Sequence, residues 1–256
     1  MRTPKMLGGI LLSLTLLLGI ASCSRTRSAR TNNPQGQPQQ SPRADAVDLL
    51  RDSGVDVTNL SNIPEVAIPD AVLARANCLI VVPQMVKGGF VFGAKYGRGV
   101  ATCKNNGQWS APAFVTIAGG SWGAQIGAEV VDLVLAVMNQ DGMDALLNSH
   151  FKIGGYGSVA AGPVGRQASA QQGGWAQAGV LTYSRTKGLY AGLTLEGAYV
   201  NSENDLNQAY YGRPLQAKTI LSGEINAPQN AGLFLDPVRA AVGQAKAKQA
   251  QQQATE

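Results

Sequence analysis

The strongest constraint on the fold is the stretch 87–127, in which glycines alternate with short apolar runs. Aromatic and β-branched runs of strand length are separated by clusters of Gly, Asn and Lys, a pattern typical of a β-meander. The segment 105–107, Asn-Asn-Gly, predicts a tight hairpin turn, because Asn and Gly tolerate positive φ. Paired glycines at 88–89 and 119–120 indicate bends or close passage of another backbone. We therefore place a β-meander at the centre of the domain.

Helix signals surround this meander. Ser41 as N-cap, Pro42 at the first helical position and Gly54 past the end predict a first helix. A short helix is expected from Pro69 to Ala76, followed by a strand that Pro83 closes.

The remaining elements follow in order along the chain. Residues 129–138 favour a strand doubly covered by other elements, although a helix is an alternative. The other expected elements are a helix at 141–148, a hairpin of 178–185 with 189–200, and short helices at 205–211 and 214–221. The predicted class is α+β: a mainly antiparallel, strongly bent, Gly-rich β-sheet or partial barrel with short helices before it, inserted in it and after it.

The N-terminus predicts export. Residues 1–22 carry two basic residues and then an apolar run too short for a membrane span, as in a secretory signal. The end of this run resembles the bacterial lipoprotein signal, with Cys23 as the acylated N-terminus of the mature chain. Two or more acyl chains make a durable anchor. Ser24 follows in place of aspartate, which favours the outer membrane.

Residues 23–40 are polar, basic and rich in Pro and Gln, which predicts a flexible tether. Its 17 residues from Ser24 to Gln40 give a reach of roughly 20–25 Å. Two roles are open for its arginines: contact with anionic headgroups, or simply keeping the linker soluble. The net charge of the full chain is +5, and removal of the signal lowers it by two. This small net positive charge is compatible with binding to anionic lipid surfaces and does not indicate nucleic-acid binding.

A series of ordered blocks resembles the SYLF domain family over residues 43–223. The blocks include VKGGFVFGAKYGRGV, WSAPAFVTIAGGSWGAQIGAE and AYYGRPLQAKTIL, and they lie at 76–83, 86–100, 109–129, 132–147, 157–166, 183–198 and 209–221. The resemblance implies a non-enzymatic, lipid-binding domain without a cofactor. Eukaryotic members bind phosphoinositides and, in yeast actin-patch proteins, actin. Actin is not an expected partner for an exported bacterial protein.

Cations at predicted turns and strand ends are the expected contacts for anionic phospholipid or phosphoinositide-type headgroups. These six candidates are Lys87, Lys95, Arg98, Lys104, Arg185 and Lys187. Tyrosine and tryptophan side chains at 96, 109, 122 and 190 suit either a membrane interface or the core.

No catalytic or metal site is expected. The single histidine, His150, ends a predicted helix, and the sequence lacks a Gly-x-Ser-x-Gly elbow. Cys78 and Cys103 lack the paired spacing of metal ligands. A simple meander puts these two cysteines on its first and third strands, roughly 10 Å apart, which favours buried free thiols over a disulfide.

Two acids, Asp132 and Glu196, fall in apolar strands. Since a buried carboxylate needs a partner, ion pairs are expected, with Arg166 or Arg98 as the partner. A proton-binding or ligand-binding role is the alternative.

We thus expect a lipid-anchored, non-enzymatic protein at the periplasmic face of the outer membrane. Its parts are a signal peptide (1–22), a tether (23–40), a lipid-binding SYLF domain (41–223) and an Ala/Gln/Lys-rich tail (224–256) that is partly helical or disordered. The alternative function is an envelope scaffold that binds another protein, which predicts an exposed apolar patch without a basic rim.

Overall fold

The chain divides into two compact units, Met1–Gln39 and Gln40–Glu256. The computed structural model describes only residues of the second unit. These residues are 41–61, 68–89, 92–122, 127–147, 151–152, 159–162, 178–186, 189–192, 195 and 197–254.

Helices flank a mainly antiparallel sheet. The helices are α1 (Pro42–Ser61), α2 (Asp70–Arg75), α3 (Gln140–Leu147), α5 (Asn204–Tyr211), α6 (Ala217–Leu221), η2 (Gln229–Ala231) and α7 (Gly232–Gln253). The strands are β1 (Cys78–Gly89), β2 (Phe92–Asn105), β3 (Gln108–Trp109), β4 (Ala113–Trp122), β5 (Gly127–Val137), β6 (Phe151–Lys152), β7 (Val159–Ala161), β8 (Val180–Thr186), β9 (Leu189–Gly192) and β10 (Ala198–Ser202).

The strands lie in the order β6-β10-β4-β2-β1-β5-β8-β7, with β3 beside β2 and β9 beside β8. All pairs in the described part are antiparallel except β7 with β8. This architecture confirms the predicted α+β class.

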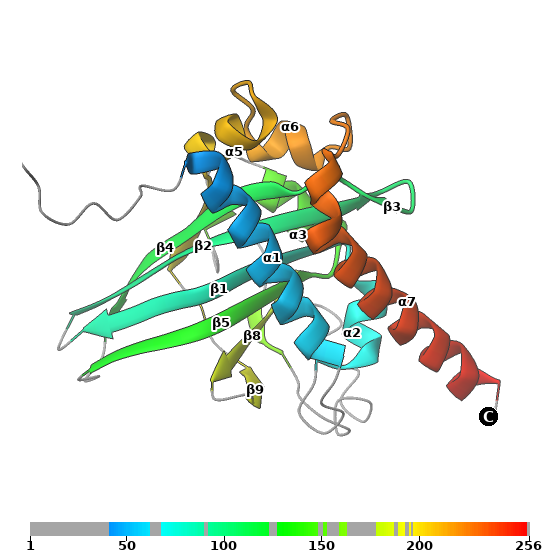
Figure 1. Ribbon diagram of the computed structural model, residues 1–256. Helices are drawn as coiled ribbons and strands as arrows, with labels where there is room; N and C mark the ends of the chain where they lie inside the picture. The colour runs from blue at the N-terminus through cyan, green and yellow to red at the C-terminus, as the bar shows by residue number, and fades with distance from the viewer. Residues whose placement is uncertain are drawn as a thin grey trace, which may run out of the picture. The chain divides into compact units, whose positions relative to one another are not determined.

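Each face of the sheet carries its own hydrophobic core. On one face, side chains such as Val81, Val100 and Phe114 pack against α1, α2, α5 and α7. On the other face, side chains such as Ile80 and Leu135 pack against α3 and α6. Figure 1 shows α1 and α7 running next to each other across the first face, in front of β1, β2 and β5. Helical cover on both faces explains why residues 133–137 are apolar at successive positions.

The first helix begins as predicted and ends later. The backbone N–H of Ala44 donates to Ser41 Oγ at 3.3 Å, which satisfies one free donor of the first turn. Gly54, expected beyond the end, lies inside α1. A Cβ atom at this position would lie 2.0 Å from the carbonyl oxygen of Leu233. The glycine therefore allows close contact between α1 and α7.

Strand β1 does not end at Pro83. It continues to Gly89 through a register shift against both of its neighbours, β2 and β5. Gln84 has a positive φ of 52° there, and its backbone N–H donates to Asp132 Oδ1 at 3.1 Å. The irregularity accommodates Pro83, which has no backbone N–H to donate to a neighbouring strand.

The expectation of free thiols at Cys78 and Cys103 was wrong, because these residues form a disulfide with a Cα–Cα distance of 4.0 Å. The error came from dividing residues 92–105 into two strands at their glycines. The structure has one strand, β2, directly beside β1, with the two cysteines opposite each other in register. At Gly97, a Cβ would lie 2.6 Å from Val82 Cγ1, so this glycine accommodates a neighbouring side chain.

Two other expectations for the second half were partly confirmed. The turn at 106–107 has the positive φ values expected, 52° and 83°, and the hairpin of β8 with β9 is present. Its second strand does not extend to residue 200, because 198–202 form β10, which pairs with β4.

The Ala/Gln/Lys-rich tail is helical where it is described, in α7. Its buried residues are Phe234, Leu235, Val238, Ala241, Val242 and Ala245. They belong to the core that includes α1 and α2. The tail therefore helps to build the domain. None of the described helices combines the length and apolar content needed to cross a bilayer.

Candidate functional site

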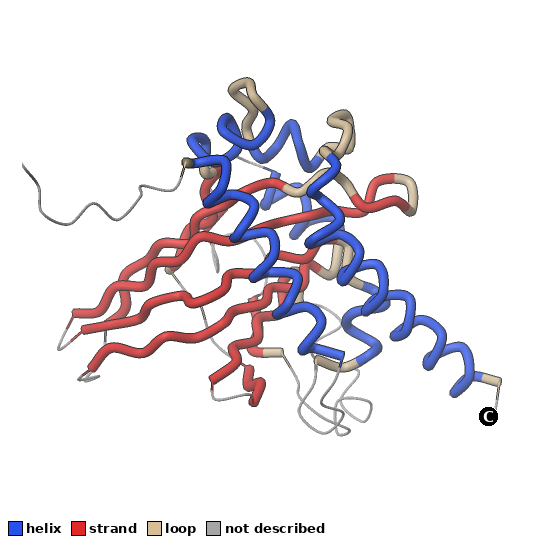
Figure 2. The backbone as a smooth tube through the Cα atoms, viewed as in Figure 1, coloured by secondary structure: helices blue, strands red, loops and turns tan. Residues whose placement is uncertain are grey.

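One end of the sheet is left uncovered by the helices. In Figure 2 the strands β1, β2, β4 and β5 project beyond α1 at the lower left. The described residues of this projection, 86–89, 92–98, 118–122 and 127–130, are called the open strand end below. Unlike the centre of the sheet, it has no helix packed over it in either figure.

Apolar side chains line up across the open strand end on the face that α1 covers further along. Val86 pairs with Tyr96 and with Val130, Tyr96 pairs with Ala118, and Ala118 pairs with Tyr199. Directly paired residues share a face of the sheet. The exposed fractions are 48% for Val86, 54% for Tyr96, 55% for Val130 and 41% for Tyr199. We call these five residues the apolar row.

The next positions outward on this face are small. Gly88 pairs with Ala94 and with Ala128, and Ala94 pairs with Gly120. Small side chains leave the face flat, so a ligand surface can approach the backbone closely. Scattered single apolar residues are normal on a protein surface, whereas a continuous row of this kind indicates a binding surface.

Three of the six candidate cations lie at the open strand end. Lys87 and Lys95 pair across β1 and β2 and point to the face opposite the apolar row. Lys87 Nζ forms an ion pair with Glu129 Oε2 at 3.2 Å. Arg98 is exposed and lies two residues from Tyr96, on the face of the apolar row. The open strand end thus has the apolar row and Arg98 on one face and the two lysines on the other.

Lys104 lies at the other end of β2. Its Nζ is 4.9 Å from the ring centre of Trp109 and donates to the Ala74 carbonyl oxygen at 3.3 Å. Burial, with a smaller contribution from Lys246, lowers the pKa of Lys104 to about 8. The structure therefore does not bring Lys104 together with the cations at the open strand end.

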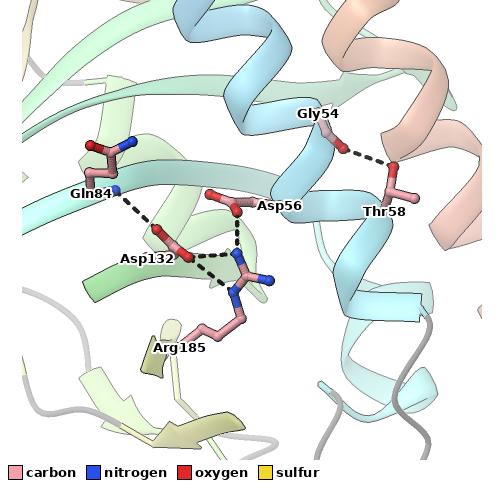
Figure 3. Close-up of polar contacts among 6 residues, drawn as sticks. All are labelled: Gly54, Asp56, Thr58, Gln84, Asp132 and Arg185. Carbon is pink, nitrogen blue, oxygen red and sulfur yellow. Dashed lines mark hydrogen bonds and ion pairs between the residues drawn. The ribbon is translucent and has the colours of Figure 1, made fainter. Parts of the chain in front are cut away.

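Arg185 is part of a different arrangement, which Figure 3 shows. Its Nη2 lies 2.6 Å from Asp132 Oδ2 and 2.7 Å from Asp56 Oδ1. Its Nε also donates to Asp132 Oδ2, at 3.0 Å. The predicted ion pair of Asp132 is therefore present, with Arg185 as partner in place of Arg166 or Arg98. We call Asp56, Asp132 and Arg185 the Asp–Arg cluster.

Asp56 was not among the residues that the sequence indicated. Its side chain is 7% exposed, and it extends from α1 toward β5 and β8 (Figure 3). Burial, followed by the charge of Asp132, raises the pKa of Asp56 to about 7, although Arg185 acts in the opposite direction. The sequence signal that could have found Asp56 was its position on the helix. Ser53, three residues earlier, and Val57, the next residue, both face the core.

Several expected site residues lie outside the described residues, so their placement stays a prediction. These are Cys23, Arg166, Lys187 and Glu196, and His150, to which no site role was assigned, also lies outside. Within the described ranges, no group of three His, Cys, Asp or Glu side chains could hold a metal ion.

The comparisons with known proteins agree with the SYLF resemblance. Residues 118–241 match the family model Ysc84, described as a Las17-binding protein actin regulator. This part of the chain is similar to the Ysc84 (SYLF) family, and it contains residues 118–122 and 127–130 of the open strand end.

Two of the similar proteins come from yeast and mouse. The chain is 36% identical over 203 residues to LAS seventeen-binding protein 3 of Saccharomyces cerevisiae, covering 77% of this chain and 43% of that protein. It is 33% identical over 202 residues to SH3 domain-containing YSC84-like protein 1 of Mus musculus, covering 78% of this chain and 58% of that protein. The chain thus spans about half the length of these relatives. The name of the yeast relative describes binding to LAS seventeen.

Proposed function

We propose that this protein is a non-enzymatic, lipid-anchored envelope protein whose open strand end binds anionic phospholipid headgroups. The observation that carries the proposal is the exposed apolar row with cations on both faces of the same strands. Apolar and aromatic side chains suit the boundary between headgroups and acyl chains, and long basic side chains reach phosphates from beside it. The proposed location is the periplasmic face of the outer membrane, with Cys23 as the anchor.

The expected affinity of the open strand end alone is low. A lysine or arginine near an anionic surface contributes about 1 kcal/mol, so three cations supply at most about 3 kcal/mol before the apolar row is counted, and Glu129, which pairs with Lys87, offsets part of it. A short tether raises the effective concentration of the domain at the bilayer and makes such a weak site useful. This is the role we assign to residues 23–40.

Co-sedimentation with vesicles tests the proposal. The unit Gln40–Glu256, which contains both hydrophobic cores, is mixed with neutral, phosphatidylglycerol, cardiolipin or phosphoinositide vesicles at low and high salt. We expect binding to anionic vesicles that weakens as salt is added, because exposed charges are screened. The triple variant Lys87→Glu, Lys95→Glu, Arg98→Glu should lose this binding.

A matched variant controls for net charge. Arg213→Glu, Lys218→Glu and Arg239→Glu reverse the same number of charges at exposed positions away from the open strand end, and this variant should retain most of the binding. Equal losses in both variants would mean that only net charge matters. Absence of binding to every vesicle would reject the lipid proposal.

A protein partner is the second candidate. The exposed apolar row favours it, since such surfaces also mark protein interaction sites, and the yeast relative is named as a binding protein of LAS seventeen. The scaffold hypothesis predicted an apolar patch without basic residues at its edge. Arg98, which lies beside the apolar row, does not fit that prediction. Capture of an envelope protein through Tyr96, together with no binding to vesicles, would favour this candidate.

A further inference from the structure

The Asp–Arg cluster borders the open strand end. Asp132 and Val130 lie two residues apart on the same face of β5, which corresponds to roughly 7 Å. Asp132 also accepts the backbone N–H of Gln84 at the irregularity of β1, at 3.1 Å. The cluster therefore connects α1, β1, β5 and β8 beside the apolar row, as Figure 3 shows for its central contacts.

Both carboxylates of the cluster bind the same guanidinium nitrogen, Arg185 Nη2. The charged groups that face Asp56 from the described elements are Asp132 on β5, Arg185 on β8 and Asp52 on α1. Two carboxylates thus share one guanidinium in a place where Asp56 is shielded from water, and the exposed Asp52 adds a weaker negative charge from the same helix. Such a group of like charges favours the uptake of one proton.

We propose that the Asp–Arg cluster takes up a proton at Asp56 and thereby strengthens binding of the open strand end to anionic membranes at lower pH. This inference rests on the proposed lipid-binding function and adds its regulation.

The physical basis is the position of the charge. Ionised Asp56 adds a negative charge within about one Debye length of the open strand end, about 8–10 Å at moderate ionic strength. It therefore repels an anionic surface and partly offsets Arg98 and the lysines. Protonation removes this repulsion. An anionic membrane also concentrates protons at its surface, so approach to the membrane itself favours the protonated cluster.

The pKa of about 7 for Asp56 sets the range in which this switch operates. A charge near an anionic surface contributes about 1 kcal/mol, which corresponds to about fivefold in affinity. Because Asp56 lies behind the contacting residues, we expect a two- to fivefold loss of affinity as the pH rises through about 7.

The experiment measures vesicle affinity of the unit Gln40–Glu256 between about pH 5.5 and about pH 7.5, a range in which ordinary carboxylates remain ionised and which ends below the pKa of about 8 of Lys104. Phosphatidylglycerol vesicles at low salt are the probe. The wild-type protein should bind more tightly at the acidic end. Asp56→Asn, which is neutral and keeps an oxygen for Arg185, should bind tightly throughout, with the pH dependence lost.

Two variants serve as controls. Asp52→Asn removes one negative charge from the same helix, one turn away, and should keep the pH dependence, because Asp52 makes the smallest of the contributions that raise the pKa of Asp56. His150→Gln removes the single histidine, whose ordinary pKa of about 6.5 lies in the same range. A transition that disappears in His150→Gln and persists in Asp56→Asn would overturn the inference.

A second measurement applies even if Asp56→Asn does not fold. Carboxyl carbon NMR of the wild-type protein follows the titration of Asp56 directly, with and without anionic lipid nanodiscs. Linkage requires that, if protonation strengthens membrane binding, membrane binding raises the proton affinity of Asp56 by the same factor, and its pKa by the logarithm of that factor. An unchanged pKa in a bound complex would reject the switch.

The two proposals fail in different ways. No binding at any pH would reject the lipid-binding function and the switch with it. Salt-sensitive binding that is independent of pH would reject the switch alone and leave the function standing.

Discussion

At the scale of single residues, glycine has two opposite roles on the helices. Gly54 lies where α1 touches α7, and a Cβ there would come 2.0 Å from the Leu233 carbonyl oxygen. Gly243 lies on the exposed side of α7, where a Cβ would meet nothing within 4 Å. The two positions therefore form a matched pair for the same substitution.

We predict opposite effects of Gly→Ala at these positions. Gly54→Ala should lower the free energy of unfolding by about 1–3 kcal/mol, because the helices must separate. Gly243→Ala should raise it by about 0.5–1 kcal/mol through helix propensity. Urea denaturation measures both. A neutral Gly54→Ala variant would contradict the close contact of α1 with α7.

The stability of the protein should depend on Asp56 as the pH changes. Its pKa is raised from 3.8 to about 7 in the folded protein. Between these values the folded protein keeps a proton that the unfolded chain has released, so stability falls as the pH rises. The slope from this group is at most about 1.4 kcal/mol per pH unit. Denaturation of wild type and Asp56→Asn from acidic to neutral pH tests this, and equal slopes would contradict it.

At the scale of elements, the disulfide joins β1 to β2 across 25 residues of sequence. Closing a loop of this size restricts the unfolded chain by about 3.5 kcal/mol in the chain-entropy model. The double variant Cys78→Ala, Cys103→Ala should be destabilised by about this amount. Addition of a reductant should then destabilise the wild type and leave the variant unaffected. A reductant without effect on the wild type would indicate free thiols.

The C-terminal helix should be necessary for folding. The large apolar side chains that it buries contribute about 1.5–3 kcal/mol each, and the total stability of a domain is only about 5–15 kcal/mol. A chain that ends at Gly232 should therefore lack a cooperative thermal transition in circular dichroism.

A shorter truncation provides the control. A chain that ends at Ala247 retains every buried residue of α7, from Phe234 to Ala245, and loses an exposed ion pair between Lys248 and Asp70. Such pairs contribute about 0–1 kcal/mol. This chain should fold, and if both truncations were equally stable, α7 would not belong to the core.

The sequence predicted the helices, strands and turns better than it predicted which strands pair with each other. Helix caps, turn residues and the spacing of apolar residues depend only on neighbours in the sequence. For this reason α1, α2, α5 and the turn at 106–107 could be predicted. Strand pairing depends on distant residues: Gly97 was taken as an interruption, although it lies inside β2 beneath Val82. This one error placed Cys78 and Cys103 too far apart.

The candidate site shows the same division. That Asp132 needs a partner followed from its apolar strand, but the identity of Arg185 and Asp56 depended on how α1 crosses the sheet. The apolar row could not be found in the sequence, because Val86, Tyr96 and Val130 meet only through the register of β1 with its two neighbours.

At the scale of the whole molecule, the centre of the sheet and the open strand end differ in their helical cover. The centre is covered by helices on both faces and holds the two cores, while the open strand end exposes apolar side chains and cations. In the proposed arrangement the covered part is the rigid support and the open strand end meets the bilayer, with the tether setting the distance to the membrane.

Site-specific fluorescence tests this arrangement most directly. Val130 on the open strand end and Val55 on α1 are the same residue type and are 55% and 54% exposed. Each is replaced by a cysteine that carries an environment-sensitive dye, in the unit Gln40–Glu256 with its disulfide intact. With anionic vesicles, the dye at position 130 should shift to shorter wavelength and the dye at position 55 should not. A shift at position 55 alone, or at neither position, would contradict the account.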